Sequence, residues 1–304
     1  MGTGMGTGKP PLPASPHDWS LGFNDDGFLA SLQTKRQEIL AAPLVMNLWR
    51  APTENDGLKN FIGLRDMPEY VFYVENKVMF EWLDHGLDEL RFSLEQREGD
   101  VPRADQPAAC LQLSHRVTSR TGHQCGFFHQ TWSTGLRGPR ASFIFDLDPA
   151  LPELPRVGLA CALVPGYEQV SWYGLGPEEG YADRKAGLRL GNWQSSVAGL
   201  AVPYVLPQEN GNRTGTRWLR LSNGRGAALR IQGGSPFDFS ATHVSAGQLW
   251  AARHWHEIQP QAETLVYLDA AQRGLGSASC GPDTLERYRL RPRAWRMDLE
   301  FGLE

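Results

Sequence analysis

The sequence has little that would suit a nucleic-acid-binding, membrane or exported protein. Its 30 basic and 34 acidic residues nearly cancel, and the formal net charge of −4 gives no indication of a nucleic acid or an anionic membrane as a partner. No apolar run is long enough to cross a bilayer. Residues 1–18 are rich in Gly and Pro and have no apolar core, so we expect a disordered leader rather than a signal peptide.

Cysteine is also scarce, with four residues in 304: Cys110, Cys125, Cys161 and Cys280. No two of them are spaced as Cys-x-x-Cys, so the sequence does not indicate structural zinc. Without an export signal, we expect reduced thiols and a cytoplasmic protein.

No complete catalytic motif is present. The glycines of 174–180 resemble a dinucleotide-binding loop, but the third comes one position late and Pro177 interrupts the loop. Glu178 and Glu179 are adjacent, and adjacent turn residues usually diverge, whereas glycoside hydrolysis needs two carboxyl groups about 5–10 Å apart across one bond. The residues of this chain therefore do not assemble a self-sufficient hydrolase site.

What the chain does contain is period-two alternation of apolar and polar residues, which indicates half-buried strands. We expect hairpin turns at 25–27 and at Asn223-Gly224. Strands are expected at 20–24, 28–32, 69–82, 90–96, 109–119, 126–133, 140–147, 157–163, 217–221, 227–231, 264–270, 287–290 and 294–301. A short helix is expected within 236–252 and one helical turn within 177–184. This pattern predicts one large all-β domain over 19–304, a sandwich of antiparallel sheets.

Two histidines in His254-Trp-His-Glu257 would lie on the same side of a strand, since side chains repeat every two residues. Such a pair suits metal binding or acid–base chemistry. The alternative is a pair of hydrogen-bonded histidines inside or at the rim of the sandwich.

The stretch 47–57, Asn-Leu-Trp-Arg-Ala-Pro-Thr-Glu-Asn-Asp-Gly, concentrates polar groups beside a rigid turn. Pro52 fixes the turn, residues 54–56 are all polar, and Gly57 permits a positive φ. A solvated surface turn has this composition, and so does a loop that positions a polyhydroxylated ligand or a neighbouring domain.

Residues 47–57 also resemble the opening motif of the C-terminal domain, or small chain, of the bacterial β-galactosidases of glycoside hydrolase family 2. Further blocks that resemble this family follow in order at 170–185, 203–217, 254–257 and 273–282. The family more often has Asp in place of Glu54 and Asn in place of Gly180. The similarity runs from about Phe23 to the C-terminus, and it implies a large antiparallel β-supersandwich similar to galactose mutarotase.

The resemblance implies a module of a β-galactosidase, an enzyme that hydrolyses terminal β-D-galactosides such as lactose with retention. In this family the catalytic glutamates lie on a separate (β/α)8 barrel, and this chain shows no alternation of strands and helices. We therefore expect the isolated chain to be inactive. It would share an active site with a large chain or N-terminal catalytic domains, as part of an oligomer. Mg²⁺, with Na⁺ as a second candidate, is expected on that catalytic part, and no metal or cofactor on this chain.

By position, the resemblance places a mobile active-site loop at 57–66, with Gly57 as its hinge and Leu58 beside it. Cys280 falls where some members have a Trp that stacks on the aglycone sugar. A thiol offers less apolar surface than an indole, so we expect weaker stacking there. Asn55 and Asp56 are weaker candidates for contact with the galactoside.

Most other markers of the family are expected to be structural, because buried charges need partners. These markers are Arg50, Asp56, Glu178, Asp183, Arg184, Glu209, Asn210 and Arg217.

Two other functions are alternatives to this hypothesis. An aldose 1-epimerase would need a carboxylate base and a histidine acid in one cleft, and the candidates for these roles are His243, His254, His256, Glu257 and Glu209. A carbohydrate-binding module would bind galactose or lactose without any catalytic partner.

Overall fold

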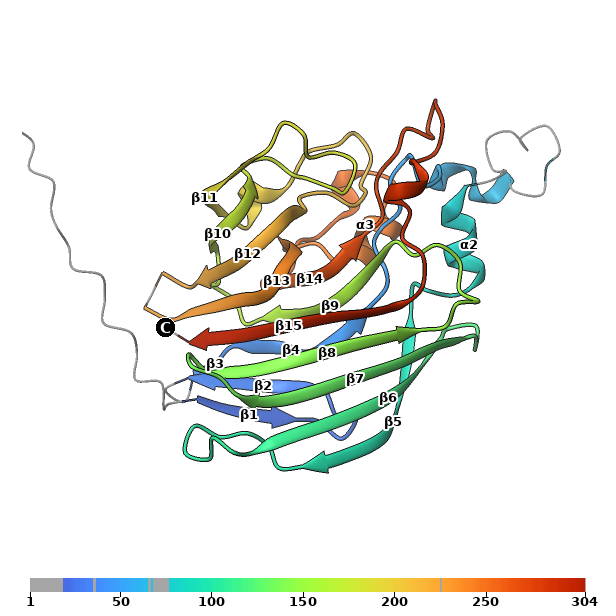
Figure 1. Cartoon of the computed structure of the whole chain (residues 1–304). Coiled ribbons are helices and arrows are strands. Elements are labelled where there is room, and N and C mark those ends of the chain that lie inside the picture. Colours follow the sequence, from blue (N-terminus) through green and yellow to red (C-terminus); the bar gives the residue numbers. More distant parts are fainter. Residues whose placement is uncertain (1–18, 35–36, 65–66, 68–76, 225, 304) are drawn as a thin grey trace, which may run out of the picture.

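One extended antiparallel sheet dominates the structure (Figure 1). The computed structural model describes residues 19–34, 37–64, 67, 77–224 and 226–303. Among these residues, fifteen strands belong to the sheet, so the prediction of an all-β, antiparallel fold is confirmed. The expected leader at 1–18 lies outside the described residues.

The strands are β1 (Trp19–Phe23), β2 (Leu29–Thr34), β3 (Gln37–Glu38), β4 (Leu40–Asn47), β5 (Leu90–Gly99), β6 (Cys110–Ser119), β7 (Gln124–Thr134), β8 (Pro139–Leu147), β9 (Arg156–Leu163), β10 (Gln169–Gly176), β11 (Arg189–Ser196), β12 (Arg213–Ser222), β13 (Ala228–Thr242), β14 (Thr264–Gln272) and β15 (Ala294–Leu303). The α-helices are α2 (Val78–Asp84) and α3 (Ala246–Ala251). Short 3-10 helices are η1 (Lys59–Leu64), η3 (Ala198–Leu200), η4 (Trp255–Glu257) and η5 (Glu286–Tyr288). No helix in the described part of the chain is long and apolar enough to cross a membrane.

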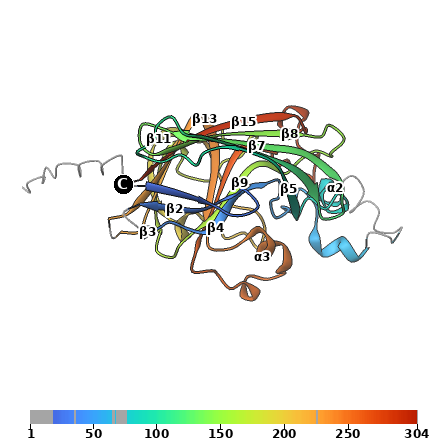
Figure 2. The same ribbon diagram turned by 90° about the horizontal axis from the view of Figure 1, so that it is seen from below.

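The sheet closes on itself around an apolar core. Its strands follow the order β1-β2-β4-β9-β14-β13-β15-β8-β7-β6-β5. Seen from below, β7, β8 and β15 form one layer, and β2 and β4 lie across from them (Figure 2). Phe28, just before β2, stacks on His115 of β6 with ring centroids 4.6 Å apart, and meets Phe92 of β5 edge-on at 4.9 Å. The two ends of the strand order therefore pack against each other.

Large aromatic side chains fill the space between the layers. Trp132 of β7 is fully buried and meets Phe143 of β8 edge-on at 5.6 Å. It also stacks on Phe301 of β15, with ring centroids 5.8 Å apart. Each such ring buries a large apolar area, which makes this cluster a main contributor to the stability of the sandwich.

The long strand β13 joins two parts of the sheet. Its first half pairs with β15 and its second half with β14, while β12 pairs along its other edge. Beyond β12 lie β10 and the edge strand β11. The loop that follows β11 thereby lies beside the second half of β13, where Ala201 and Asn210 line one pocket together with Ser240 and Thr242.

Three expected elements differ from the structure. Residues 78–84 form helix α2 rather than a strand, because Val78, Met79 and Trp82 are buried at helical spacing, and 69–76 lie outside the described residues. Residues 287–290 do not form a strand, since Glu286–Tyr288 is a 3-10 turn. The segment 177–184 ends in a tight turn closed by Arg184 N donating to Tyr181 O, not in a helical turn. The helix expected within 236–252 is confirmed as α3.

Candidate functional site

The turn after β4 is fixed from within by its own first residues. Asn47 Oδ1 accepts a hydrogen bond from Trp49 N (3.1 Å), and Asn47 Nδ2 donates to Trp49 O (2.9 Å). Trp49 is buried and meets Trp82 of α2 and Trp250 of α3 edge-on, with ring centroids 6.4 and 6.0 Å apart. Trp49 therefore anchors the turn against helices α2 and α3.

A buried ion pair supports the turn from below. Arg50 Nη2 donates to both oxygens of Asp56 at 2.8 and 3.0 Å, and Thr53 donates to Asp56 Oδ2 from both N and Oγ1 at 2.9 Å. Arg50 Nη1 donates to Arg273 O at 2.8 Å. Arg50, Asp56 and Arg273 have no exposed surface. The structure thus places Asp56 in the support of the turn, and not on a surface that a substrate can reach.

Asn55 connects this turn to a segment more than 200 residues away. Its Nδ2 donates to Gly276 O (3.0 Å), and its Oδ1 accepts from Ser279 N (3.1 Å) and Ser279 Oγ (2.8 Å). Cys280 follows directly and is exposed. We call residues 53–57 and 276–281 together the two-turn surface. The structure therefore brings Asn55, Gly57 and Cys280 close together. The resemblance predicts that these three residues contribute to one active site.

Asp183 fixes the base of the second turn. Its carboxylate accepts from Leu275 N (2.9 Å), Gly276 N (2.7 Å) and Thr284 Oγ1 (3.0 Å). Burial by itself would raise the pKa of Asp183, but these hydrogen bonds outweigh it and keep the pKa below its ordinary value. Gly276 adopts φ +66°, and a Cβ there would lie 2.6 Å from Thr284 N, so only glycine fits this corner.

Gly57 lies in close contact with helix α2. A Cβ at this position would meet Met79 Cε at 2.9 Å, and Met79 N donates to Asp56 O at 3.1 Å. Gly57 is buried and Leu58 is half-buried. The role of Gly57 as a hinge stays a prediction. The structure adds that a larger residue here would crowd the side chain of Met79.

Lys59 anchors the start of the expected active-site loop 57–66, of which residues 65–66 lie outside the described residues. Its Nζ donates to the carbonyl oxygens of Pro207 (2.9 Å), Leu249 (2.9 Å) and Ala252. Burial lowers the pKa of Lys59, and Glu257 opposes this shift in part. Movement hinged at Gly57 would have to break these hydrogen bonds. Sequence reasoning missed Lys59, because its three partners are distant in the chain and carry no side-chain signature.

A second buried cluster lies behind the loop 201–210. Arg156 Nη2 is 3.2 Å from Glu209 Oε1 and 3.2 Å from Asp269 Oδ2, and Gln272 Nε2 donates to Asp269 Oδ2 at 2.9 Å. Burial raises the pKa of Asp269 to about 7 and also raises the pKa of Glu209, although Arg156 lowers both. We call Arg156, Glu209, Asp269 and Gln272 the Arg156 cluster.

The remaining family markers divide into buried and exposed residues. Glu179, rather than Glu178, is buried, and it accepts from Arg184, Tyr204 and Gly211 N. Glu178 is exposed, so the two glutamates diverge as expected. Arg217 is also exposed, but its Nη1 donates to Gly215 O at 3.1 Å and its guanidinium lies over the ring of Tyr173, which fits the structural role expected of it. Asn210 is structural, since its Oδ1 accepts from Val202 N at 3.0 Å.

The histidine motif is not on a strand, and that prediction is wrong. Trp255–Glu257 forms the 3-10 helix η4, and both His254 and His256 are exposed, with their rings stacked 5.4 Å apart. His243 instead bonds Glu168 Oε2 and Glu263 O, both at 2.9 Å. No histidine lines the pocket that contains Glu209, so the described residues do not assemble the pair that an epimerase would need there. They also include no group of three or more His, Cys, Asp or Glu placed to bind a metal ion.

Comparison with known proteins gives consistent relatives. Residues 15–303 match the family described as "Beta galactosidase small chain". The chain is 29% identical to a β-galactosidase of Staphylococcus xylosus, over 93% of this chain and 26% of that protein. It is 31% identical to a β-galactosidase of Arthrobacter sp. (strain B7), over 82% of this chain and 25% of that protein. It thus spans about a quarter of the length of these relatives.

Among solved structures, the chain is similar to a galactose mutarotase-like protein from Lactobacillus casei. The TM-score is 0.47 at 9% sequence identity, and the match covers 94% of this chain and 97% of that one.

Proposed function

This chain belongs to the β-galactosidase small-chain family, and we propose that it is a non-catalytic module that completes a β-galactosidase active site. The catalytic glutamates would lie on a barrel-bearing large chain or on N-terminal catalytic domains. The reaction would be retaining hydrolysis of terminal β-D-galactosides such as lactose.

The two-turn surface is the observation that carries this proposal. Asn55 binds the turn around Ser279, so that the start of the loop 57–66 and Cys280 belong to one connected surface. The buried pair of Arg50 and Asp56 and the carboxylate of Asp183 fix the two turns from below. A rigid support of this kind suits a surface that must position a sugar against a catalytic group of another domain.

The metals implied by the resemblance would be bound by the catalytic part. Mg²⁺ prefers several oxygen ligands in octahedral geometry, and the described residues offer no cluster of acidic side chains and histidines that fits it. In this proposal the chain supplies no catalytic step and binds no metal. Its residues would shape the site and contact the galactoside.

Hydrolysis of lactose, or of a chromogenic galactoside, tests the proposal. The purified chain alone should show no activity above buffer, and mixing with a β-galactosidase catalytic part that lacks this module should restore hydrolysis. Robust hydrolysis by the chain alone would contradict the module hypothesis. Failure of the chain to associate with any such catalytic part would count against it equally.

Replacing Cys280 tests its assignment to the aglycone position. Cys280→Trp should lower KM for lactose in the complete enzyme, because an indole offers a larger apolar face for the aglycone sugar. Cys280→Ser is the matched control and should leave KM nearly unchanged. An unchanged KM in Cys280→Trp would remove Cys280 from the substrate-binding residues.

A further inference from the structure

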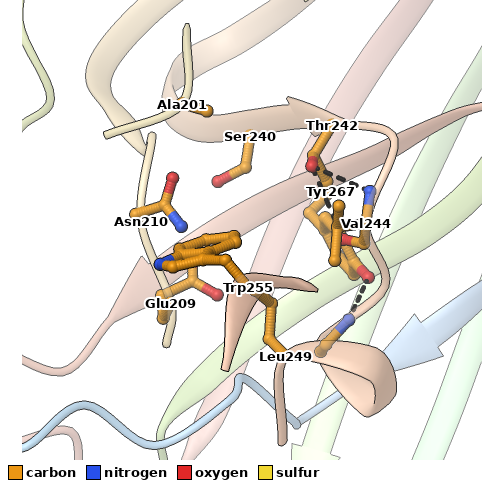
Figure 3. Close-up of a pocket in the computed structure, with 10 residues that line it drawn as sticks. Ala201, Glu209, Asn210, Ser240, Thr242, Val244, Leu249, Trp255 and Tyr267 are labelled. Carbon is orange, nitrogen blue, oxygen red and sulfur yellow. Dashed lines mark hydrogen bonds between the residues drawn. The ribbon is translucent and has the colours of Figure 1, made fainter. Parts of the chain in front are cut away.

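A small cavity lies beneath Trp255, beside the Arg156 cluster (Figure 3). Its volume is about 40 Å³. Polar groups on one side come from Glu209, Ser240 and Tyr267, and the indole of Trp255 lies across them. Ser240 and Tyr267 are directly opposite each other on β13 and β14, so the pairing of the strands places both side chains on the same face of the sheet.

Ser240 provides the strongest sign that this cavity receives a polar partner. Its side chain points into the cavity, toward Asn210 (Figure 3), and Ser240 is only 4% exposed. Its Oγ has no hydrogen-bond partner among the described residues. Leaving a buried hydroxyl unpaired is unfavourable, so a ligand that binds this hydroxyl gains the hydrogen bond that the protein does not make.

The two other polar groups also have bonding capacity left. Tyr267 Oη accepts from Ala246 N at 3.3 Å, which leaves its own hydrogen free to donate. Glu209 Oε1 accepts from Arg156 at 3.2 Å, and within the described part of the chain no hydrogen bond reaches Oε2. The cavity therefore offers one carboxylate acceptor, one phenol donor and one hydroxyl that can do either.

This combination selects the chemistry of the ligand. An anion would be repelled by the Glu209 carboxylate, and a metal cation would find only one carboxylate in the cavity and a buried arginine behind it. A neutral molecule with several hydroxyl groups and one apolar face satisfies all three polar groups and stacks on Trp255. A pyranose sugar has both properties.

Trp255 covers the cavity and controls its size. As it stands, the space has room for water but not for a sugar ring. Trp255 lies on the exposed 3-10 helix η4, and its indole makes one hydrogen bond, Nε1 to Tyr204 O at 2.6 Å. We propose that the cavity binds a single pyranose sugar, which enters when Trp255 swings outward. None of the residues that line the cavity belongs to the two-turn surface, and binding there needs no catalytic partner.

Calorimetry on the purified chain tests this, with methyl β-D-galactopyranoside as the probe and mannitol as a polyol without a ring. We expect saturable, weak binding of the pyranoside and little or none of mannitol. Ser240→Ala should weaken pyranoside binding about fivefold, the equivalent of one hydrogen bond of about 1 kcal/mol. Because Ser240 Oγ bonds nothing in the protein, this variant should fold as stably as the parent.

A second variant, Ala201→Trp, blocks the rim of the cavity without replacing a buried residue. Ala201 is exposed and lines the cavity, so Ala201→Trp should abolish binding. Ala198→Trp, also exposed and three residues away but outside the cavity, should bind like the parent. Absence of saturable heat, or equal binding by Ala201→Trp and the parent, would overturn the proposal. Neither result would bear on hydrolysis by the complete enzyme, so this proposal and the proposed function fail separately.

Discussion

Asp56 and Asp269 are both fully buried beside an arginine, but their hydrogen bonding differs. Asp56 accepts four hydrogen bonds, which involve both of its oxygens. Asp269 accepts through Oδ2, while its Oδ1 has no partner among the described residues. Desolvation of a buried carboxylate is expensive, and hydrogen bonds to the charged form offset it. Asp56 therefore holds a backbone turn through hydrogen bonds to both of its oxygens. Asp269 has fewer such bonds, and burial raises its pKa to about 7.

The surroundings of the two carboxylates follow the same division. Around Asp56, hydrogen bonds between side chains and backbone close the two-turn surface, and the buried atoms without a partner in the described part of the chain are Arg50 Nε and Arg273 Nη1. Around Asp269, buried atoms of Arg156, Gln272 and Ser240 lack partners in the described part of the chain, and a cavity lies nearby. The first region suits a rigid wall that positions a substrate for another domain. The second has unsatisfied polar groups and space, which suits an internal binding site.

The largest expected effect comes from removing the charge of Asp56. Asp56→Asn removes the charge between Arg50 and Arg273, which have no exposed surface. Removing one partner of a buried ion pair typically costs about 3–5 kcal/mol of unfolding free energy. Denaturant unfolding measures this loss. Asp105→Asn, at an exposed carboxylate, is the control and should change stability by less than about 0.5 kcal/mol. A loss as small as in the control would show that the Asp56 pair does not support the turn.

The Arg156 cluster should make the free energy of unfolding depend on pH. The carboxyl of Asp269 has an ordinary pKa of 3.8 in the unfolded chain and a pKa of about 7 in the folded protein. Between these two pH values, the folded protein therefore keeps a proton on Asp269 that the unfolded chain has lost. The unfolded state then binds fewer protons, so stability should fall by a few kcal/mol as pH rises from about 4 to about 7. Burial also raises the pKa of Glu209 and Asp238, which adds to the fall.

Asp269→Asn should flatten this part of the curve. Unfolding measured at several pH values should show a shallower fall in the variant, while Asp105→Asn should follow the parent. An unaltered slope in Asp269→Asn would mean that this carboxyl is charged in the folded protein, and that the contrast with Asp56 is smaller than the hydrogen bonds indicate.

Lys59 links the two-turn surface to the Arg156 cluster. It lies two residues after Gly57, and its Nζ donates to Pro207 O, two residues before Glu209. Lys59→Met keeps the length of the side chain but leaves three carbonyl oxygens without their donor. We expect a loss of about 1–2 kcal/mol and faster amide hydrogen exchange at 58–64. Lys185→Met, at an exposed lysine, is the matched control. Unchanged exchange would show that the loop start is fixed by Gly57 and α2 alone.

The fold was largely predictable because alternation marks half-buried strands, and both expected hairpins, at 25–27 and 223–224, join paired strands. Strands β3, β4, β10 and β11 were missed. β3 has only two residues, and Pro43 or several glycines and polar residues interrupt the alternation of the other three. For the site, the resemblance located 47–57 and Cys280, but not their contacts. Arg273, Ser279 and Lys59 reach residues about 150 or more positions away, and no local pattern records such pairings.

The smallest effect expected is at the exposed margin of the two-turn surface. Asn55→Ala removes the hydrogen bonds to Gly276 O and Ser279, at a cost of about 1 kcal/mol because the site is partly solvated. The clearer consequence of Asn55→Ala should be a change in the rate at which a thiol reagent labels Cys280. Among the four cysteines, Cys280 is the exposed one, whereas burial raises the pKa of the Cys125 thiol to about 11. A thiol reagent should therefore label Cys280 first, and faster in Asn55→Ala, because the turn that contains it is no longer fixed. Cys280→Ser identifies the labelled thiol. Equal labelling rates in Asn55→Ala and the parent would mean that the two turns stay together without Asn55, supported by Asp183 and the Asp56 pair.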